Sequence, residues 1–222
     1  MLNGVHMDPL TAPEQRVLGC LIEKRFTTPD QYPLTLNSLR LACNQSTNRD
    51  PVVNYDELTV REAAQRLTKY GLARLASGHT SRAVKYRHLA EDALGLGREQ
   101  LALLAVLLLR GDQTPGELKT RTERVIEWTS LDQVDAVIEE LAERDYVVNV
   151  GRRPGQKEDR FAHLLGGERT PGEPAAASYS DSDAERPAAG AQTAGDSALV
   201  AELRARITEL EAEVASLRSR LN

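Results

Sequence analysis

The chain has 222 residues, of which 41% are hydrophobic, 27% charged and 4% aromatic, and its formal net charge is −5. This composition excludes collagen-like and wholly disordered proteins. The longest apolar run, Leu101 to Leu109, has nine residues, whereas a helix needs ~20 to cross a bilayer. Because the first residues also lack the basic and apolar stretches of a secretion signal, we expect a cytoplasmic protein with no membrane contact.

Charge is distributed unevenly along the chain. Residues 8–90 hold 12 Lys and Arg against 8 Asp and Glu, a net charge of +4, whereas residues 91–165 hold 10 against 15, a net charge of −5. Residues 166–198 add a further net charge of −4. A polyanionic partner would therefore bind the first of these segments.

Residues 8–90 show the pattern of three helices followed by a β-hairpin. Apolar residues at helical spacing predict helices over residues 11–25 and 36–43, and a third helix that begins at Asn54 or Asp56. The first helix opens with the capping-box pattern of Thr11 and Glu14. Residues 72–77 and 83–89 are predicted strands around a turn rich in Gly and Ser. This is the element order of a winged helix-turn-helix.

Residues 91–165 repeat that order. The run Leu101–Leu109 is apolar on every face of a helix, which indicates burial between layers. Capping-box patterns at Thr114–Glu117 and Ser130–Gln133 open two further helices. Residues 146–150 and 160–165 are predicted strands around a basic turn.

A shift of 74 residues aligns the two halves. It places Val60 on Val134, Ala64 on Ile138 and Leu67 on Leu141, and one additional residue after the hairpin turn places Tyr86 on Phe161 and His88 on His163. Two elements in register indicate a duplicated module. We therefore expect an α+β fold, mainly α with small β-hairpins, in which residues 8–90 and 91–165 are tandem winged helix-turn-helix domains.

The end of the chain follows a different pattern. Residues 166–197 are rich in Gly, Pro, Ala and acidic side chains, and they are predicted to be a disordered linker because they lack apolar content. Residues 198–222 then form a heptad pattern typical of a coiled-coil helix. Its a and d positions are Val200, Leu203, Ile207, Leu210, Val214, Leu217 and Leu221. β-Branched residues at a with leucine at d favour a parallel homodimer. The alternative is a helix that folds back on its own domains.

The third helix of the first module is the candidate DNA-binding element, because the major groove of double-stranded DNA admits one helix while the hairpin contacts phosphates. Hydrogen-bond donors occupy its predicted outward face and the hairpin. They are Arg61, Gln65, Arg66, Lys69, Arg82 and Lys85. The alternatives are an ordinary solvated helix face and charges that blunt an exposed sheet edge.

The corresponding helix of the second module carries acidic residues instead. The 74-residue shift aligns the donor positions of the first helix with Asp135, Glu139, Glu140 and Glu143. Phosphate would be repelled by this face, so we assign it to a protein partner with a basic surface.

The sequence shows no glycine-rich phosphate loop, nucleophile elbow or metal-ligand spacing, so we expect no catalytic residues, cofactor or metal site. Cys20, Cys43, His88 and His163 fall at predicted core positions. The polar loop that runs from Cys43 to Pro51 has two interpretations: it reads base edges or a small ligand, or its side chains cap helix ends and form turns.

Several long motifs resemble one known family. They are Gly19–Lys24, Thr27–Leu34, Ala42–Gln45, Thr47–Val52, Leu107–Gly111 and Gln113–Leu118. Over about residues 10–165 the chain resembles the YceH-like family of bacterial proteins, and the terminal heptad helix is also similar. The resemblance implies a tandem winged-helix fold in a bacterial cytoplasm, and it brings no catalytic residues.

The sequence therefore predicts a non-enzymatic, dimeric DNA-binding protein, a transcriptional regulator that contacts the duplex through its first module. The alternative is a protein-interaction scaffold that uses winged helices as packing surfaces and does not bind DNA. The acidic second module and the overall charge favour the scaffold, and the basic first module favours DNA.

Overall fold

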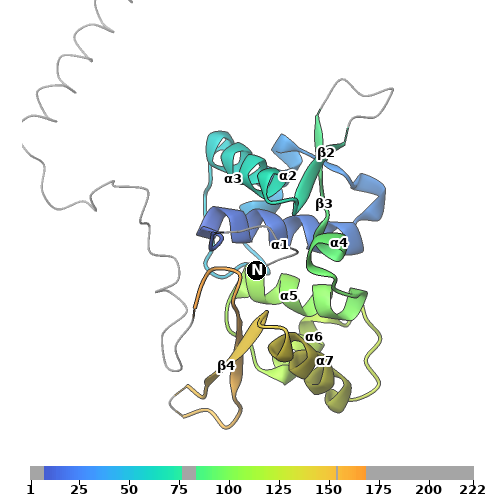
Figure 1. The fold of residues 1–222 in the computed structure, drawn as a ribbon, viewed down its shortest axis with the longest axis vertical. Helices are drawn as coiled ribbons and strands as arrows, with labels where there is room; N and C mark the ends of the chain where they lie inside the picture. Colours follow the sequence, from blue (N-terminus) through green and yellow to red (C-terminus); the bar gives the residue numbers. More distant parts are fainter. Residues whose placement is uncertain (1–7, 77–83, 154, 169–222) are drawn as a thin grey trace, which may run out of the picture. The chain divides into compact units, whose positions relative to one another are not determined.

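A computed structural model describes residues 8–76, 84–153 and 155–168, all of which belong to one structural unit. Within these residues the fold is mixed α+β, with seven α-helices and two small antiparallel sheets (Figure 1). Arg82 and the predicted coiled-coil positions from Val200 to Leu221 lie outside the described residues, as does nearly all of the predicted linker.

The first half contains four helices, a 3-10 turn and three strands. These are α1 (Ala12–Thr27), η1 (Pro29–Gln31), β1 (Leu34–Thr35), α2 (Leu36–Cys43), α3 (Glu57–Lys69), β2 (Ala73–Ala76), β3 (Lys85–His88) and α4 (Ala90–Leu94). The strand order is β1-β3-β2, because the short β1 pairs with β3 on the edge away from β2. The predicted hairpin thus has a third strand that the sequence pattern did not indicate.

Local capping determines where these helices begin. The Thr11 amide donates to Glu14 Oε2 at 3.0 Å, which is one half of the predicted capping box. Asp56, rather than Asn54, caps α3, because its Oδ1 accepts from the Thr59 amide at 2.7 Å.

The second half contains α5 (Arg98–Arg110), α6 (Pro115–Thr122), α7 (Leu131–Glu143), β4 (Val147–Gly151) and β5 (Arg160–His163). Thr114 and Glu117 form the predicted capping box of α6 in both directions, at 3.2 and 3.0 Å. At α7 the prediction was only half correct. Ser130 caps the helix, but the Gln133 side chain accepts from the Thr129 amide rather than from Ser130.

The bounds of the elements follow the predicted repeat. Helices α3 and α7 begin and end at positions exactly 74 residues apart, and strands β3 and β5 at positions 75 apart. The aligned apolar pairs Val60 and Val134, and Leu67 and Leu141, are all fully buried. The β-bridge between Leu34 and Tyr86 in the first half has an equivalent in the second half, the bridge between Gln113 and Phe161.

Helices α1 and α5 lie side by side at the centre (Figure 1). As its all-round apolar sequence predicted, α5 is buried on nearly every face, and it packs against α1, α6 and α7. Gly19 of α1 allows this close approach, since a Cβ there would lie 2.9 Å from the Leu109 side chain. Residues from both halves join one apolar cluster, which includes the expected core residues Cys20 and Cys43. Among the described residues, no helix is long and apolar enough to cross a membrane.

Candidate nucleic-acid interface

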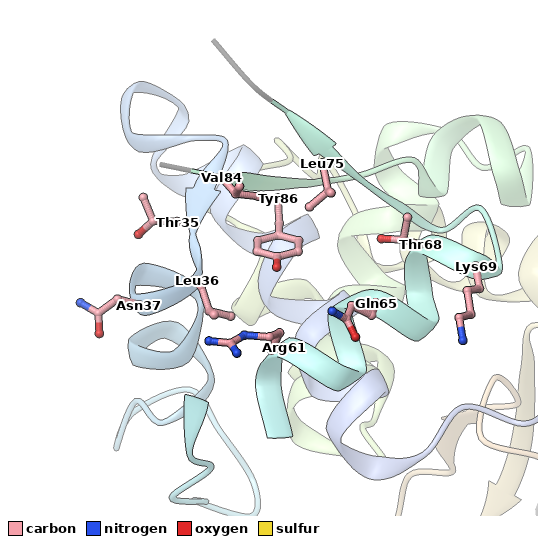
Figure 2. A pocket seen from close by; sticks show the side chains of 10 residues that line it. All are labelled: Thr35, Leu36, Asn37, Arg61, Gln65, Thr68, Lys69, Leu75, Val84 and Tyr86. Carbon is pink, nitrogen blue, oxygen red and sulfur yellow. The ribbon is translucent and has the colours of Figure 1, made fainter. Parts of the chain in front are cut away.

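The exposed face of α3 forms one wall of an open pocket with a volume of about 710 Å³, which we call the α3 hollow. The start of α2 and the β2–β3 hairpin form its other walls (Figure 2). The hollow is lined by Thr35, Leu36, Asn37, Arg61, Gln65, Thr68, Lys69, Leu75, Val84 and Tyr86.

The periodicity of α3 places its donors in the hollow. Val60, Ala63, Ala64 and Leu67 are buried against the core, so the opposite side of the helix faces outward. Arg61, Gln65 and Lys69 are accordingly exposed, and Figure 2 shows them along one side of α3. Three of the predicted site residues are thus brought together in the hollow.

The positive charges of Arg61 and Lys69 are only partly compensated by other side chains. Arg61 is ion-paired with Glu57, and both side chains are about half exposed, at 45% and 54%, so that pair is weak in water. Neither the Gln65 nor the Lys69 side chain has a hydrogen bond or ion pair with another described residue. These two side chains are available to a ligand.

Arg66 has a different environment from the other α3 donors. Its Nε lies 2.7 Å from Oε1 of Glu14, whose side chain is 1% exposed, and its Nη2 donates to the Tyr70 hydroxyl at 2.9 Å. Arg66 therefore fixes α3 to the start of α1, and it does not line the hollow.

Lys85 also lies outside the hollow. Side chains alternate between the faces of a strand, and β3 directs Tyr86 into the hollow (Figure 2). Lys85 therefore lies on the other face of the sheet, as do the cross-strand partners Arg74 and Arg87. The described strands of the hairpin supply two basic side chains from β3 and one from β2, but on the face away from α3.

An apolar patch in the hollow was not anticipated. Leu75 pairs with Tyr86 across the hairpin, and Leu75 and Val84 are each 53% exposed. The signal was present in the sequence as strand alternation, because Val84 and Tyr86 must occupy one face of the strand and Lys85 and Arg87 the other. The hollow thus combines a polar helix wall with an apolar hairpin wall.

The predicted acidic face of α7 is largely exposed to solvent. Glu139, Glu140 and Glu143 are exposed, and Glu140 accepts a hydrogen bond from Gln100 Nε2 at 2.8 Å. Partial burial, together with the charges of Asp132, Glu139 and Glu158, raises the pKa of Asp135. Among the described residues no ion pair involves Glu139, Glu140 or Glu143, so the negative charge of this face contrasts with the donors of α3.

The polar loop after α2 is held by buried hydrogen bonds. Arg49 donates to both carboxylate oxygens of Glu23, at 3.0 and 2.6 Å, and to the Ala42 carbonyl at 3.1 Å. The Asn44 side chain bridges the amide and carbonyl of Tyr55. These contacts favour the structural interpretation of the loop.

No group of three or more His, Cys, Asp or Glu side chains within residues 8–76, 84–153 and 155–168 is arranged to hold a metal ion.

Comparison with known proteins then places the chain in a family. A family model described as "Protein of unknown function, DUF480" matches residues 10–156. The chain belongs to the DUF480 family. One relative is a UPF0502 protein of Stenotrophomonas maltophilia, which is 46% identical over 212 residues, or 94% of each chain. Another is a UPF0502 protein of Citrobacter koseri, which is 43% identical over 220 residues, or 96% of this chain and 94% of the relative.

A third relative of this DUF480 chain is the UPF0502 protein YceH of Escherichia fergusonii, 42% identical over 220 residues, which is 96% of this chain and 94% of that protein. The resemblance to the YceH-like family is therefore confirmed. The names of these DUF480 relatives state neither an activity nor a ligand.

Proposed function

We propose that the chain is a non-enzymatic protein that binds double-stranded DNA through the α3 hollow. The observation that carries this proposal is the row of exposed donors on α3, Arg61, Gln65 and Lys69, beside the start of α2. Side chains of these types contact phosphates and base edges.

The order of elements supports a winged-helix interpretation of both halves. In each half two helices precede an amphipathic helix of 13 residues, α3 or α7, which an antiparallel hairpin follows directly. In this architecture the third helix enters the major groove, which is about 12 Å wide. The N-terminus of α2, where the Thr35 hydroxyl accepts from the Ser38 amide at 3.2 Å, adds a partial positive charge to the same hollow.

The two halves would then have different roles. The first would bind the duplex, and the acidic α7 face of the second would contact a basic protein surface. The coiled coil predicted for residues 198–222 would hold two copies together, which would double the number of phosphate contacts and set the spacing of two half-sites. A dimeric transcriptional regulator fits this combination.

Fluorescence anisotropy with a labelled duplex and the full chain tests the proposal. Affinity should fall with salt along a log–log slope of about −0.9 for each phosphate contacted. Replacing Arg61 and Lys69 by glutamine should make that slope shallower by about 2 units, because two phosphate contacts are lost. Replacing both by glutamate should abolish binding.

The repeat offers a matched control. Asp135→Asn with Glu143→Gln changes the aligned positions of α7, and it should leave the affinity unchanged or raise it. Loss of binding in that control would mean that the modules are assigned in the wrong order. Binding of the wild-type chain that does not depend on salt, or no binding at all, would contradict the proposal.

A protein-interaction scaffold is the second candidate. The exposed Leu75 and Val84 favour it, because apolar side chains gathered in a hollow are typical of protein contacts. Leu75→Ser with Val84→Ser separates the two functions. A scaffold would lose its partner with this variant, whereas DNA binding through α3 would persist with a nearly unchanged salt slope.

A further inference from the structure

A second cavity, of about 320 Å³, lies among α1, α5 and α6, and we call it the α1–α5 cavity. Its apolar lining comes from Phe26 of α1, from Ala102, Ala105, Val106 and Leu109 of α5, and from Val125 after α6. Pockets for small molecules are typically about 300 to 1,000 Å³, mostly apolar, with a few polar groups that fix the ligand. The size and the apolar wall therefore suit a small organic molecule.

Three arginines line the same cavity, namely Arg110, Arg121 and Arg124. Arg124 is exposed and makes no ion pair with any described residue. Arg110 donates from Nη1 to Asn48 Oδ1 at 3.0 Å, but its Nε is buried without a hydrogen-bond partner in the described part of the chain. Neither side chain forms an ion pair with a carboxylate of the described residues.

Arg121 is only weakly compensated. Its Nη1 lies 3.4 Å from Glu117 Oε2, yet Arg160 holds the two oxygens of that carboxylate at 2.9 and 3.2 Å. Burial and the positive charge of Arg110 lower the pKa of Arg121. The Glu117 carboxylate thus serves two guanidinium groups, and Asp50, which forms no ion pair with Arg121, adds only a weaker attraction.

The acidic residue that lines the cavity does not neutralise this charge. Both oxygens of Glu23 accept hydrogen bonds from the buried Arg49, at 3.0 and 2.6 Å. The cavity therefore has a surplus of positive charge beside an apolar wall. A cation would be repelled there, and a neutral apolar molecule would leave the arginines without a counter-charge.

We propose that the α1–α5 cavity binds a small organic anion, with its acidic group among Arg110, Arg121 and Arg124 and its apolar body against Phe26 and Val106. A carboxylate suits the planar fork of a guanidinium, which donates two parallel hydrogen bonds. The ligand would contact both halves of the chain, because Phe26 belongs to α1 and the arginines to α5, α6 and the segment after it. This site is separate from the α3 hollow.

Calorimetric titration of the full chain with 1-naphthoate tests the proposal. The matched neutral probe is 1-naphthalenemethanol, which has the same ring system and no charge. We expect saturable binding of one naphthoate per chain, tighter than the alcohol by at least about tenfold. Equal affinities for the two probes, or no saturable heat at millimolar naphthoate, would overturn the proposal.

Two variants and a control locate the site. Arg121→Gln should weaken naphthoate binding by about tenfold or more while changing alcohol binding little. Val106→Phe keeps every charge but fills the cavity, so it should remove the binding of both probes. Arg152→Gln, which removes an arginine paired with Asp159 in the β4–β5 hairpin, should change neither. Thermal unfolding of each variant shows that it is folded, and an equal loss of binding in Arg152→Gln would overturn the assignment.

Discussion

His88 is buried at the end of β3, and its imidazole has few polar neighbours. Its Nδ1 accepts from the Ala90 amide at 3.3 Å, while Nε2 has no hydrogen-bond partner among the described residues. Burial, with the nearby charges of Arg25 and Arg87, lowers the pKa of His88 to about 4. The folded protein therefore holds this side chain neutral at physiological pH.

This neutral histidine predicts a loss of stability in mild acid. In the unfolded chain it titrates near its ordinary pKa of 6.5, so between pH 6.5 and 4 the unfolded state binds a proton that the folded state does not. The free energy of unfolding should fall through this window as pH decreases, by up to about 3 kcal/mol. His88→Asn keeps an acceptor near Nδ1 and does not titrate. Urea unfolding at pH 7 and pH 4.5 should show a smaller difference for this variant, and an unchanged difference would contradict the assignment.

Residues of the α3 hollow show how far sequence reasoning reaches at this scale. The helical period was sufficient to place Arg61, Gln65 and Lys69 outside the core, because burial of one face fixes the other. It could not show that Arg66 pairs with Glu14, since that contact depends on how α1 crosses α3. Lys85 was included for its charge alone, although alternation along the strand places it on the face opposite Tyr86.

The contact between α1 and α5 depends on a glycine in the middle of a helix. A glycine inside a helix usually lowers the stability of that helix by about 1 kcal/mol relative to alanine. Here a Cβ would meet Leu109 at 2.9 Å and Leu108 at 3.1 Å. We expect Gly19→Ala to destabilise the protein by about 1 to 3 kcal/mol, because overpacking a dense core forces side chains off their rotamers.

A second glycine provides the control. Gly116 lies in the first turn of α6, and the nearest atoms to its Cβ position are 3.8 Å away. Gly116→Ala should therefore raise the free energy of unfolding by several tenths of a kcal/mol, or about 1 at most. Chemical unfolding measures both changes. If both variants were stabilised, the close approach of α1 and α5 would not be limiting.

Elements with a strong period were predictable, whereas strand β1 and helix α4 were not. Helices α3 and α7 combine a buried stripe with a cap residue, so their positions follow from local sequence. Strand β1 has two residues and α4 has five, which is too few to display a period. Both depend on contacts made by other parts of the chain, as when Leu34 pairs with Tyr86.

At the scale of the whole molecule, the oligomeric state predicted from the heptads can be tested with the full chain. Leu203→Glu with Leu210→Glu places charges at two d positions and should convert a dimer into a monomer in sedimentation experiments. Ala205→Glu with Ala212→Glu adds the same charges at outward f positions, and this variant should stay dimeric. A sedimentation coefficient that is the same for both variants would contradict dimerisation through this segment.

The joint core has a consequence for how the two halves can differ. One apolar cluster holds Leu103, Leu104 and Leu107 of α5 together with Val17 and Leu21 of α1. A substitution in either helix therefore affects the packing of both halves. Surface positions carry no such coupling and tolerate substitution at little cost. The two halves therefore share one core but remain free to differ at their outer faces. Specialisation by reversal of surface charge is the route that such an architecture leaves open.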